Sequence, residues 1–371
     1  MNQSNQSVNM SEKLKRVCDE FRIRGEYQSY DEIKVGNVNR TYKVNFIRDD
    51  GKPKSYIVQE VNTYVFKNPI QVMENIDKVT GYIHDKAPDK RSLHFHHTID
   101  RKTYVLDENG FWRLFNYIPS NTYNTTTNMA VIRNAGEAFG EFQMMLSDFD
   151  ASQLYETIPD FHNTRKRYEK LIADAQADPC GRVAAVKPEL DWLLSVQDKA
   201  CRLTDMHEAG ELPLRVTHND TKINNVLFDS STDEALVVID LDTVMPGLVG
   251  HDFGDAIRFA ANFVEEDCPE YEKAGVNMDV FRAFTEGFLK HTAATLTDNE
   301  ISTLALSCLT LTCELATRFL DDYIQGDPYF KINYPEHNLV RTRCQVALAK
   351  DMLGKLDAMN KIVEECVARY R

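Results

Sequence analysis

The chain has 371 residues, which is enough for two lobes or domains that each bury a core of their own. Hydrophobic residues make up 43% of the chain and charged residues 27%, the balance of an ordinary globular protein. The net charge of −14 argues against a nucleic-acid-binding protein and against a polybasic membrane protein, although a local group of Arg and Lys can still hold an anionic substrate.

The N-terminal sequence MNQSNQSVNMSEKLKR is polar and does not predict a signal peptide. No apolar run has the length that a membrane span needs. The eight cysteines are scattered without a CxxC pair, which is typical of reduced thiols. We therefore expect a cytoplasmic protein with no membrane or nucleic-acid partner, and the sequence does not indicate an oligomeric state.

The first part of the chain alternates between helix and strand patterns. Residues 12–23 predict a short amphipathic helix, and residues 40–62 alternate apolar and polar side chains around a Gly-Lys-Pro turn, which predicts a hairpin. Residues 69–86 space apolar side chains three or four apart, as a helix does. Two further strand patterns follow at 101–118, so this part of the chain predicts a mixed lobe.

The rest of the chain is mainly helical in pattern. Residues 119–128 are polar and turn-rich, typical of a connector between lobes. One β-rich interruption stands at 215–243, and the predicted helices are 129–146, 161–176, 184–209, 276–292, 297–326 and 338–368. We therefore predict the α+β class and a two-lobed protein-kinase-like fold, with a small mixed α/β N-terminal nucleotide-binding lobe at residues 1–118 and a larger, mainly helical C-terminal lobe at 119–371.

The most informative motif is the frame His-x-Asp-x-x-x-x-Asn in the stretch RVTHNDTKINNVLF. In phosphoryl transfer, an Asp such as Asp220 accepts the proton of the acceptor hydroxyl, and an Asn such as Asn225 holds magnesium. The apolar strand ALVVIDLDT then ends in Asp240 and Asp242, and carboxylates are the hard oxygen ligands that Mg²⁺ takes. Either half alone suits a polar hairpin whose acids only solvate a turn, but together they predict a phosphotransfer site.

A resemblance strengthens this interpretation. The stretch RVTHNDTKINNVLF…VVIDLDTVMPG…HDFGDAIRF resembles the aminoglycoside phosphotransferase and choline kinase superfamily, and more closely the bacterial N-acetylhexosamine 1-kinases. The likeness extends from TYKV near residue 41 through DASQL at 150–154 to PEHNLVRTR at 335–343. It implies Asp220 as catalytic base, Asn225 and Asp240 as magnesium ligands, Asp242 as a further ligand, and ATP as the phosphate donor.

The residues Asp-Phe-Gly at 252–254 spell the magnesium-binding triplet of protein kinases. The triplet comes 32 residues after Asp220, one element too late, because the resemblance places the metal-binding Asp in the preceding strand. We expect Asp252 to be a helix N-cap and Asp255 to lie in the first turn of that helix. As an alternative to a purely structural role, Asp255 and Arg258 would face the sugar pocket.

A nucleotide also needs a cradle for its phosphates. Gly36, in KVGNVNRTYKV, allows a close backbone approach, although an ordinary hairpin turn fits the sequence equally well. The resemblance favours the cradle and implies that the loop reaches the acceptor sugar, with Asn37 where the family pattern carries His. Gln59 stands where a protein kinase carries its phosphate-pairing Lys. The N-acetylhexosamine 1-kinases also carry Gln at this position. Lys222 is a candidate for the missing cation, or else a solvated surface residue.

The base of the nucleotide is expected along RLFNYIPS at 113–120. Phe115 to Ile118 would offer backbone hydrogen bonds to adenine, with Phe115 or Tyr117 packing on the ring. From the sequence alone these aromatic residues fit a hydrophobic core equally well.

The acceptor pocket is expected in the helical lobe. Residues 312–330 resemble the segment that supplies polar contacts to the hexosamine, and the match implies Arg318, Tyr329 and Glu314. Arg318 could instead form an i,i+4 salt bridge with Glu314. Arg341 and Arg343 are two residues apart and so face different sides of a helix; we expect at most one of them, Arg341, to point into the pocket.

Together these patterns predict a kinase that uses ATP and Mg²⁺ to phosphorylate the anomeric hydroxyl of an N-acetylhexosamine, either N-acetylglucosamine or N-acetylgalactosamine. One alternative keeps the chemistry and changes the acceptor to choline, homoserine, an aminoglycoside or another sugar. The other alternative is a catalytically silent nucleotide-binding protein, motivated by Gln59.

Overall fold

The computed structural model describes residues 2–34, 38–108 and 110–371, with side chains described from residue 10 onward. The chain divides into two compact units. Unit 1 comprises residues 1–120, 153–158 and 239–244, and unit 2 comprises 121–152, 159–238 and 245–371. The expected domains at 1–118 and 119–371 follow sequence order alone, whereas in the structure two short later segments belong to unit 1.

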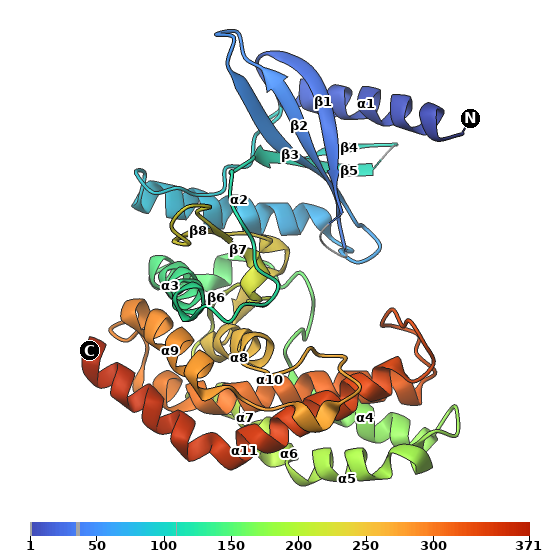
Figure 1. The fold of residues 1–371 in the computed structure, drawn as a ribbon, viewed down its shortest axis with the longest axis vertical. Helices are drawn as coiled ribbons and strands as arrows, with labels where there is room; N and C mark the ends of the chain where they lie inside the picture. The colour runs from blue at the N-terminus through green and yellow to red at the C-terminus, as the bar shows by residue number, and fades with distance from the viewer. Residues whose placement is uncertain (1, 35–37, 109) are drawn as a thin grey trace. The chain divides into compact units, whose positions relative to one another are not determined.

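Unit 1 is built on a five-stranded antiparallel sheet (Figure 1). Its strand order is β1-β2-β3-β5-β4, with β1 at Glu26–Ile33, β2 at Arg40–Ile47, β3 at Pro53–Val61, β4 at Val105–Asp107 and β5 at Gly110–Asn116. The predicted hairpin at 40–62 and the two later strands are confirmed. The sequence analysis missed β1, because its sequence EYQSYDEI is polar and mostly exposed and so lacks apolar alternation.

Two helices flank this sheet. Helix α1 (Asn2–Glu20) begins well before the predicted residue 12, and Leu14 and Val17 on its apolar side join a core with Tyr42 and Trp112 of the sheet. Helix α2 (Pro69–Lys86) has the predicted bounds and begins with a proline in its first turn, where a missing N–H costs nothing. The side chains of neighbouring strand residues alternate between faces, so the residue after Trp112 points away from the α1 side.

Unit 2 is mainly helical. Its helices are α3 (Met129–Met145), α4 (Thr164–Ala177), α5 (Lys187–Ser195), α6 (Gln197–Ala200), α7 (Arg202–Glu208), α8 (Val249–Ala260), α9 (Met278–Thr292), α10 (Asp298–Ile324) and α11 (His337–Tyr370). The predicted single helix at 184–209 is wrong, since the chain breaks there into three short helices after a 3₁₀ turn at Val183–Val186. The other predicted helices of this unit are confirmed within a few residues.

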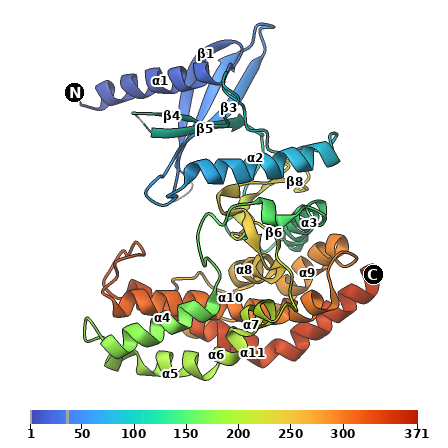
Figure 2. The ribbon, with the colours of Figure 1, turned by 180° about the vertical axis from the view of Figure 1, so that it is seen from behind.

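Helix α10 forms the centre of unit 2 and lies beside α11 (Figures 1 and 2). It contains an 18-residue window that by length and composition is apolar enough to cross a membrane, contrary to the expectation that no such run exists. Of that window 83% is buried inside the protein, as in the core helix of a globular domain.

The β-rich interruption is confirmed and forms two short antiparallel ribbons in unit 2. Strand β6 (Arg215–Thr217) pairs with β9 (Met245–Gly247), and β7 (Val226–Phe228) pairs with β8 (Ala235–Val238). The loop at 218–225 connects β6 to β7 and carries the His-x-Asp frame. The segment 239–244, which belongs to unit 1, connects β8 to β9.

Candidate active site

The loop between β6 and β7 brings the polar residues of the predicted frame together. Asn225 Nδ2 donates to the backbone carbonyl of Asp220 at 2.8 Å and to its carboxylate Oδ2 at 3.1 Å. Lys222 Nζ lies 2.8 Å from the other carboxylate oxygen, Oδ1. The turn begins at Asn219, whose φ of 63° lies in the left-handed region that Asn tolerates better than most residues. The loop therefore holds one carboxylate, one amide and one ammonium group in direct contact.

The electrostatics of Lys222 are set by this contact. Burial alone would lower the pKa of Lys222, but the attraction of Asp220 and Asp255, together with the hydrogen bond to Asp220, raises it above its ordinary value. Lys222 is thus a charged, half-buried partner of the candidate base, and the alternative of a solvated surface Lys does not fit.

The backbone of this loop is held by Asp252 on α8. Its two carboxylate oxygens accept from the backbone N–H of His218 at 2.9 Å and of Asn219 at 2.8 Å, and from Gln143 Nε2 at 2.6 Å. Thr221 Oγ1 donates to the Asp252 carbonyl at 2.5 Å. Burial raises the pKa of Asp252, while the attraction of His218, followed by the N–H donors, acts in the opposite direction. Asp252 therefore anchors the two residues that precede the candidate base.

The Asp-Phe-Gly triplet has a structural role in α8, but not the one expected. Asp252 is not the N-cap: α8 begins at Val249 after Leu248, and Asp252 lies in its first turn. Phe253 is fully buried in the core. A Cβ at Gly254 would stand 2.4 Å from the Ser307 carbonyl on α10, so only glycine permits this close helix crossing.

The other predicted acids lie in unit 1, in the segment after β8. Asp240 has φ 60° and ψ 57°, and its side chain lies at the surface. Asp242 is buried, forms an ion pair with Arg113 Nη1 and accepts from Asn39 Nδ2 at 2.6 Å. Both Asp242 oxygens are therefore taken by protein donors, which does not suit the implied role as a further metal ligand.

Gln59 belongs to the same buried network. Arg113 Nε donates to Gln59 Oε1 at 2.9 Å, and Gln59 Nε2 donates to Thr41 Oγ1 at 3.0 Å. The sequence analysis missed Arg113, although a charged residue in the middle of the apolar strand FWRLF was a visible signal. The position of the missing Lys is thus filled by an amide that contacts a guanidinium from the neighbouring strand.

The candidate metal ligands fit a hard divalent cation. Asn225 uses its amide nitrogen on Asp220, and no described residue donates a hydrogen bond to its Oδ1. Asp240 presents a carboxylate at the protein surface. Mg²⁺ takes oxygen ligands of this kind from one or two protein groups and completes its shell with phosphate oxygens and water.

The expected nucleotide contacts are described only in part. Gly36 and Asn37 lie outside the described residues. Phe115 packs on Phe95 with ring centroids 5.0 Å apart, and Lys43 Nζ lies 4.5 Å from the Tyr117 ring centroid.

The carbonyl of Ile118 accepts from Ser120 Oγ at 2.9 Å. The side chains from Phe115 to Ile118 are half-buried.

The predicted acceptor residues on α10 have separate partners. Glu314 accepts from Thr164 Oγ1 at 2.7 Å and pairs with His162 Nδ1 at 2.9 Å, so the alternative salt bridge between Glu314 and Arg318 does not form. The Arg318 guanidinium lies 6.0 Å from the ring centroid of Phe161 and 5.4 Å from that of Phe330. Among the described residues no carboxylate lies within ion-pair distance of Arg318.

A second guanidinium, missed by the sequence analysis, lies in this region. Arg167 on α4 donates to the Phe161 carbonyl at 3.1 Å, and its Nε is buried without a partner in the described protein. Burial and the nearby charge of Arg318 lower the pKa of Arg167. Tyr329 lies exposed on the following turn, which Asp322 holds through the backbone N–H groups of residues 329 and 330.

The remaining predicted arginines have partners that occupy them. Arg258 Nε and Nη2 donate to Asp255 at 3.0 and 2.8 Å, and Nη1 donates to Glu266 at 2.7 Å. Arg341 donates to Asn338 Oδ1 at 3.1 Å and to the backbone carbonyl of residue 331. Arg343 pairs with Glu189 at 2.7 Å. These contacts favour structural roles for all three.

A buried imidazole connects the acceptor region to the catalytic loop. His162 Nε2 lies 3.4 Å from the Asn219 carbonyl, while Nδ1 contacts Glu314. Burial alone would lower the pKa of His162, but the attraction of Glu314 and Asp255 exceeds it and raises the pKa, against the repulsion of Arg318. Burial likewise opposes ionisation of Glu314, yet His162 lowers the pKa of Glu314 to about 2.

The adjacent His251 is shifted in the opposite direction. Its ring centroid lies 4.9 Å from that of His162. Burial, followed by the repulsion of His162, lowers the pKa of His251 to about 3; the attraction of Glu314 opposes this shift, and His207 adds a smaller lowering effect. The two shifts therefore favour the protonated form of His162 and the neutral form of His251.

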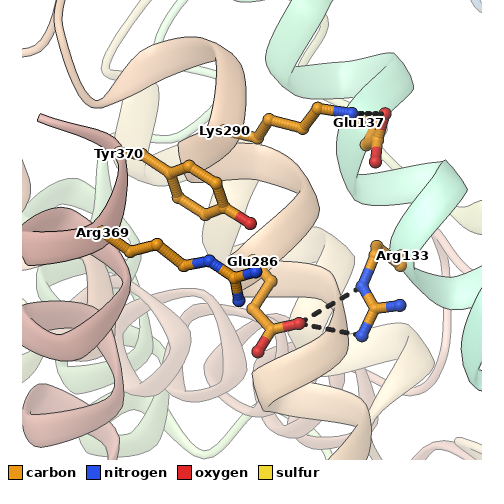
Figure 3. Close-up of a pocket in the computed structure, with 6 residues that line it drawn as sticks. All are labelled: Arg133, Glu137, Glu286, Lys290, Arg369 and Tyr370. Atoms are coloured by element: carbon orange, nitrogen blue, oxygen red, sulfur yellow. Dashed lines mark hydrogen bonds and ion pairs between the residues drawn. The ribbon is translucent and has the colours of Figure 1, made fainter.

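One surface pocket lies apart from all these residues (Figure 3). It is formed by α3, α9 and α11, and its charged groups largely pair with one another: Arg133 with Glu286 at 2.8 Å and Lys290 with Glu137 at 2.8 Å. It contains none of the predicted site residues. Exposed ion pairs of this kind contribute little to the stability of a protein. We assign it no catalytic role.

The two-lobed fold and the His-x-Asp-x-x-x-x-Asn loop together define a phosphotransferase with a protein-kinase-like fold. The model of the phosphotransferase enzyme family (APH) matches residues 31–284, more than half of the chain. The chain belongs to this family, and it is an ATP-dependent small-molecule phosphotransferase.

Solved structures share the fold at low sequence identity. An aminoglycoside phosphotransferase from Alicyclobacillus acidocaldarius is 11% identical with a TM-score of 0.61, over 95% of this chain and 96% of that one. A microcompartment-associated aminopropanol kinase is 15% identical with a TM-score of 0.61, over 94% and 98%. A choline kinase from Cryptosporidium parvum is 14% identical with a TM-score of 0.56, over 92% and 93%.

Proposed function

We propose that the protein is a cytoplasmic kinase that uses ATP and Mg²⁺ to phosphorylate the anomeric hydroxyl of an N-acetylhexosamine, giving the sugar 1-phosphate. The observation that carries the acceptor class is Arg318, whose guanidinium lies over Phe161 and Phe330 without a carboxylate partner among the described residues. A guanidinium without a carboxylate partner can donate hydrogen bonds to the hydroxyl and amide oxygens of a ligand. The neighbouring rings offer apolar faces to the C–H groups of a sugar.

The distribution of charge supports a neutral hydroxylated acceptor over a cationic one. Glu314 is neutralised by His162 and Asp255 by Arg258, while Arg318 and Arg167 add positive charge to the region. A quaternary ammonium such as choline is held by an aromatic cage, and it needs a carboxylate rather than guanidinium groups beside it. An aminoglycoside, with several ammonium groups, would meet the same repulsion.

The proposed reaction uses Asp220 as the base. Its carboxylate takes the proton of the 1-hydroxyl as the oxygen forms a bond to the γ-phosphorus of ATP, and the bond from that phosphorus to the β,γ-bridging oxygen breaks, so that ADP leaves. Asn225 orients the carboxylate through the 3.1 Å hydrogen bond. Lys222, now paired with Asp220, would donate to the transferred phosphoryl group when the nucleotide is bound.

We propose Asn225 of unit 2 and Asp240 of unit 1 each as a magnesium ligand, and the ion when bound would neutralise charge on the phosphates. We leave Asp242 out of the metal set because Arg113 and Asn39 occupy its oxygens. For the nucleotide, we propose that the edge at 115–118 receives the base; Gly36 and Asn37, the candidates for contact with the phosphates and the sugar, lie outside the described residues.

We propose Arg318 and Tyr329 as acceptor-binding residues and add Arg167. Arg258 and Glu314 are left out because neighbouring protein groups occupy their polar atoms, and Arg341 is left out because its Nη1 donates to Asn338 and to the backbone carbonyl of residue 331.

The test is a reaction of the purified protein with ATP, Mg²⁺ and a panel of free sugars, amino alcohols and aminoglycosides, followed by phosphorus NMR of the product. A proton-coupled doublet from an anomeric phosphate on an N-acetylhexosamine is the expected result. Turnover with an amine acceptor alone would overturn the sugar assignment and keep the kinase. Absence of turnover with every acceptor, while ATP still binds, would favour the catalytically silent alternative.

A matched pair of variants tests the acceptor contact. Arg318→Met should raise the KM for the sugar while leaving the KM for ATP unchanged, because the removed donors face the acceptor and not the nucleotide. Arg343→Met is the control, since Arg343 pairs with Glu189 and is not part of the proposed set. Equal effects of the two substitutions on the sugar KM would refute the role of Arg318.

A further inference from the structure

The sheet of unit 1 contains a buried charge where no catalytic cation was expected. Arg113 on β5 pairs in register with Gln59 on β3, and both side chains point to the face away from α1. The guanidinium donates through Nε to Gln59 and forms an ion pair through Nη1 with Asp242. Arg113 is 2% exposed and Asp242 is 3% exposed. A charge buried this deeply is stable only with such a set of partners.

The carboxylate of Asp242 connects this charge to two loops. Its second oxygen accepts from Asn39 Nδ2 at 2.6 Å, and Asn39 Oδ1 in turn accepts from the backbone N–H of Asn62 at 3.0 Å. Asn39 stands at the start of β2, directly after the segment with Gly36, and Asp242 stands two residues after Asp240. One buried ion pair thus fixes Asp242, two residues after the proposed metal ligand Asp240, and Asn39, directly before β2.

The backbone at Asp240 has a conformation that needs such support. Its φ of 60° is in the left-handed region, which a residue other than glycine adopts at a cost. The 3₁₀ turn Leu241–Thr243 follows at once, and the buried Asp242 is its central residue. Loss of the Arg113 contact would leave a buried carboxylate without its cation, and the turn would have to move to hydrate it.

We propose that Arg113 is a positioning residue for the metal–nucleotide site: it fixes Asp242, and through Asp242 it sets the orientation of Asp240 and the start of β2. This inference rests on the proposed function, in which Asp240 is a metal ligand. Arg113 does not touch the phosphates itself, because its Nε and Nη1 are occupied and the side chain is buried. The chain therefore has a buried cation beside Gln59, namely Arg113 of the adjacent strand. This cation holds the turn that follows the proposed metal ligand Asp240.

The experiment measures metal binding directly, by electron paramagnetic resonance of Mn²⁺ titrated into the full-length protein with ADP. Arg113→Met should weaken Mn²⁺–ADP binding by about 10–100-fold, the usual effect of losing a residue that orients a metal ligand. Asp242→Asn should have a similar effect, and the double variant should be no weaker than either single one. Arg113→Lys should recover part of the affinity, since it restores the charge.

The control is Arg16→Met, which removes an exposed cation of the same unit that pairs with Asp107. It should leave Mn²⁺–ADP binding unchanged. If Arg113→Met does not fold, Asp242→Asn, which keeps the shape of the carboxylate, carries the test. A lower melting temperature with unchanged Mn²⁺–ADP affinity in the Arg113 and Asp242 variants would overturn the inference and leave the proposed function standing.

Two further outcomes separate the inference from the proposal on which it rests. A wild-type protein that does not bind Mn²⁺–ADP at all would overturn the proposed function and the inference with it. A wild-type protein that binds Mn²⁺–ADP but phosphorylates another acceptor would support the inference as long as the variants weaken metal binding, because the assay contains no acceptor.

Discussion

Two buried carboxylates, Asp242 in unit 1 and Asp252 in unit 2, support the residues beside the proposed reaction centre by different physical means. Asp242 is neutralised by the guanidinium of Arg113. Asp252 is held mainly by neutral donors, since its carboxylate accepts from two backbone N–H groups and the Gln143 amide. By contrast, the acids proposed to do chemistry, Asp220 and Asp240, are the more exposed ones.

These carboxylates divide by burial into two groups. The buried supports are Asp242 and Asp252, and the more exposed reactants are Asp220 and Asp240. A buried acid must have every oxygen satisfied, so it is committed to the protein and unavailable to a metal or a substrate. An acid at the surface of a loop can exchange its partners when a ligand arrives. Substitutions of the reactants should therefore lower activity directly, whereas substitutions of the supports should lower stability and, at Asp242, weaken metal–nucleotide binding as well.

The largest effect is expected at the proposed base. Asp220→Asn should lower kcat by about 10²–10⁴-fold, the usual range for a positioned base, while the unfolding free energy stays close to that of the wild type. Steady-state kinetics with the best acceptor and circular dichroism would check both parts. Asp191→Asn, at an exposed i,i+4 pair with Lys187, is the matched control and should leave kcat unchanged. Activity near the wild-type level in Asp220→Asn would contradict the assignment.

The next effect concerns the support of the same loop. Asp252→Ala should lower the unfolding free energy by about 3–5 kcal/mol, because it leaves two buried N–H groups and the Gln143 amide without an acceptor. Asp252→Asn keeps one acceptor oxygen and should cost less. Urea unfolding of both variants measures the difference. Were Asp252 a metal ligand instead, Mn²⁺–ADP binding would be lost in the Asn variant at unchanged stability.

A smaller effect is expected from the glycine of the same triplet. Gly254→Ala places a methyl group 2.4 Å from the Ser307 carbonyl, so α8 must move away from α10. Overpacking of this kind costs about 1–3 kcal/mol, and thermal or urea unfolding would detect it. Gly181→Ala, at a turn where a Cβ meets no atom, controls for the loss of glycine, although its positive φ adds some strain. A variant as stable as the wild type would show that the helices separate freely.

The sequence predicts the parts of this molecule that depend on local pattern. The helix at 69–86, the hairpin at 40–62 and the His-x-Asp frame were all visible, because periodicity and motif spacing are local properties. The strand at Glu26–Ile33 was missed because an exposed edge strand needs no apolar alternation. The partners of Arg113 and Asp252 come from segments far away in the chain, so no local pattern distinguishes a supporting acid from a reacting one.

The last effects concern pH and the two neighbouring imidazoles of His162 and His251. The pKa of His162 is raised in the folded protein, so its contribution to stability is complete below its ordinary value of 6.5 and is lost as the pH rises through the folded value. The pKa of His251 is lowered to about 3, so the folded state excludes a proton that the unfolded state binds. Its contribution is complete above 6.5 and is lost as the pH falls toward 3.

These opposite shifts predict that the unfolding free energy is greatest near pH 6.5 and falls on both the acid and the alkaline side. On each side one group changes the unfolding free energy by at most about 1.4 kcal/mol per pH unit. His162→Gln should flatten the alkaline limb, and His251→Gln should flatten the acid limb between pH 6.5 and 4.5. Below pH 4.5 the acid limb should remain, because Glu314, with its pKa lowered to about 2, then begins to take up a proton in the unfolded state. Urea unfolding at pH 4, 5.5, 6.5 and 8.5 distinguishes the acid limb from the alkaline limb. Parallel plots of unfolding free energy against pH for both variants and the wild type would contradict the opposite pKa shifts of His162 and His251.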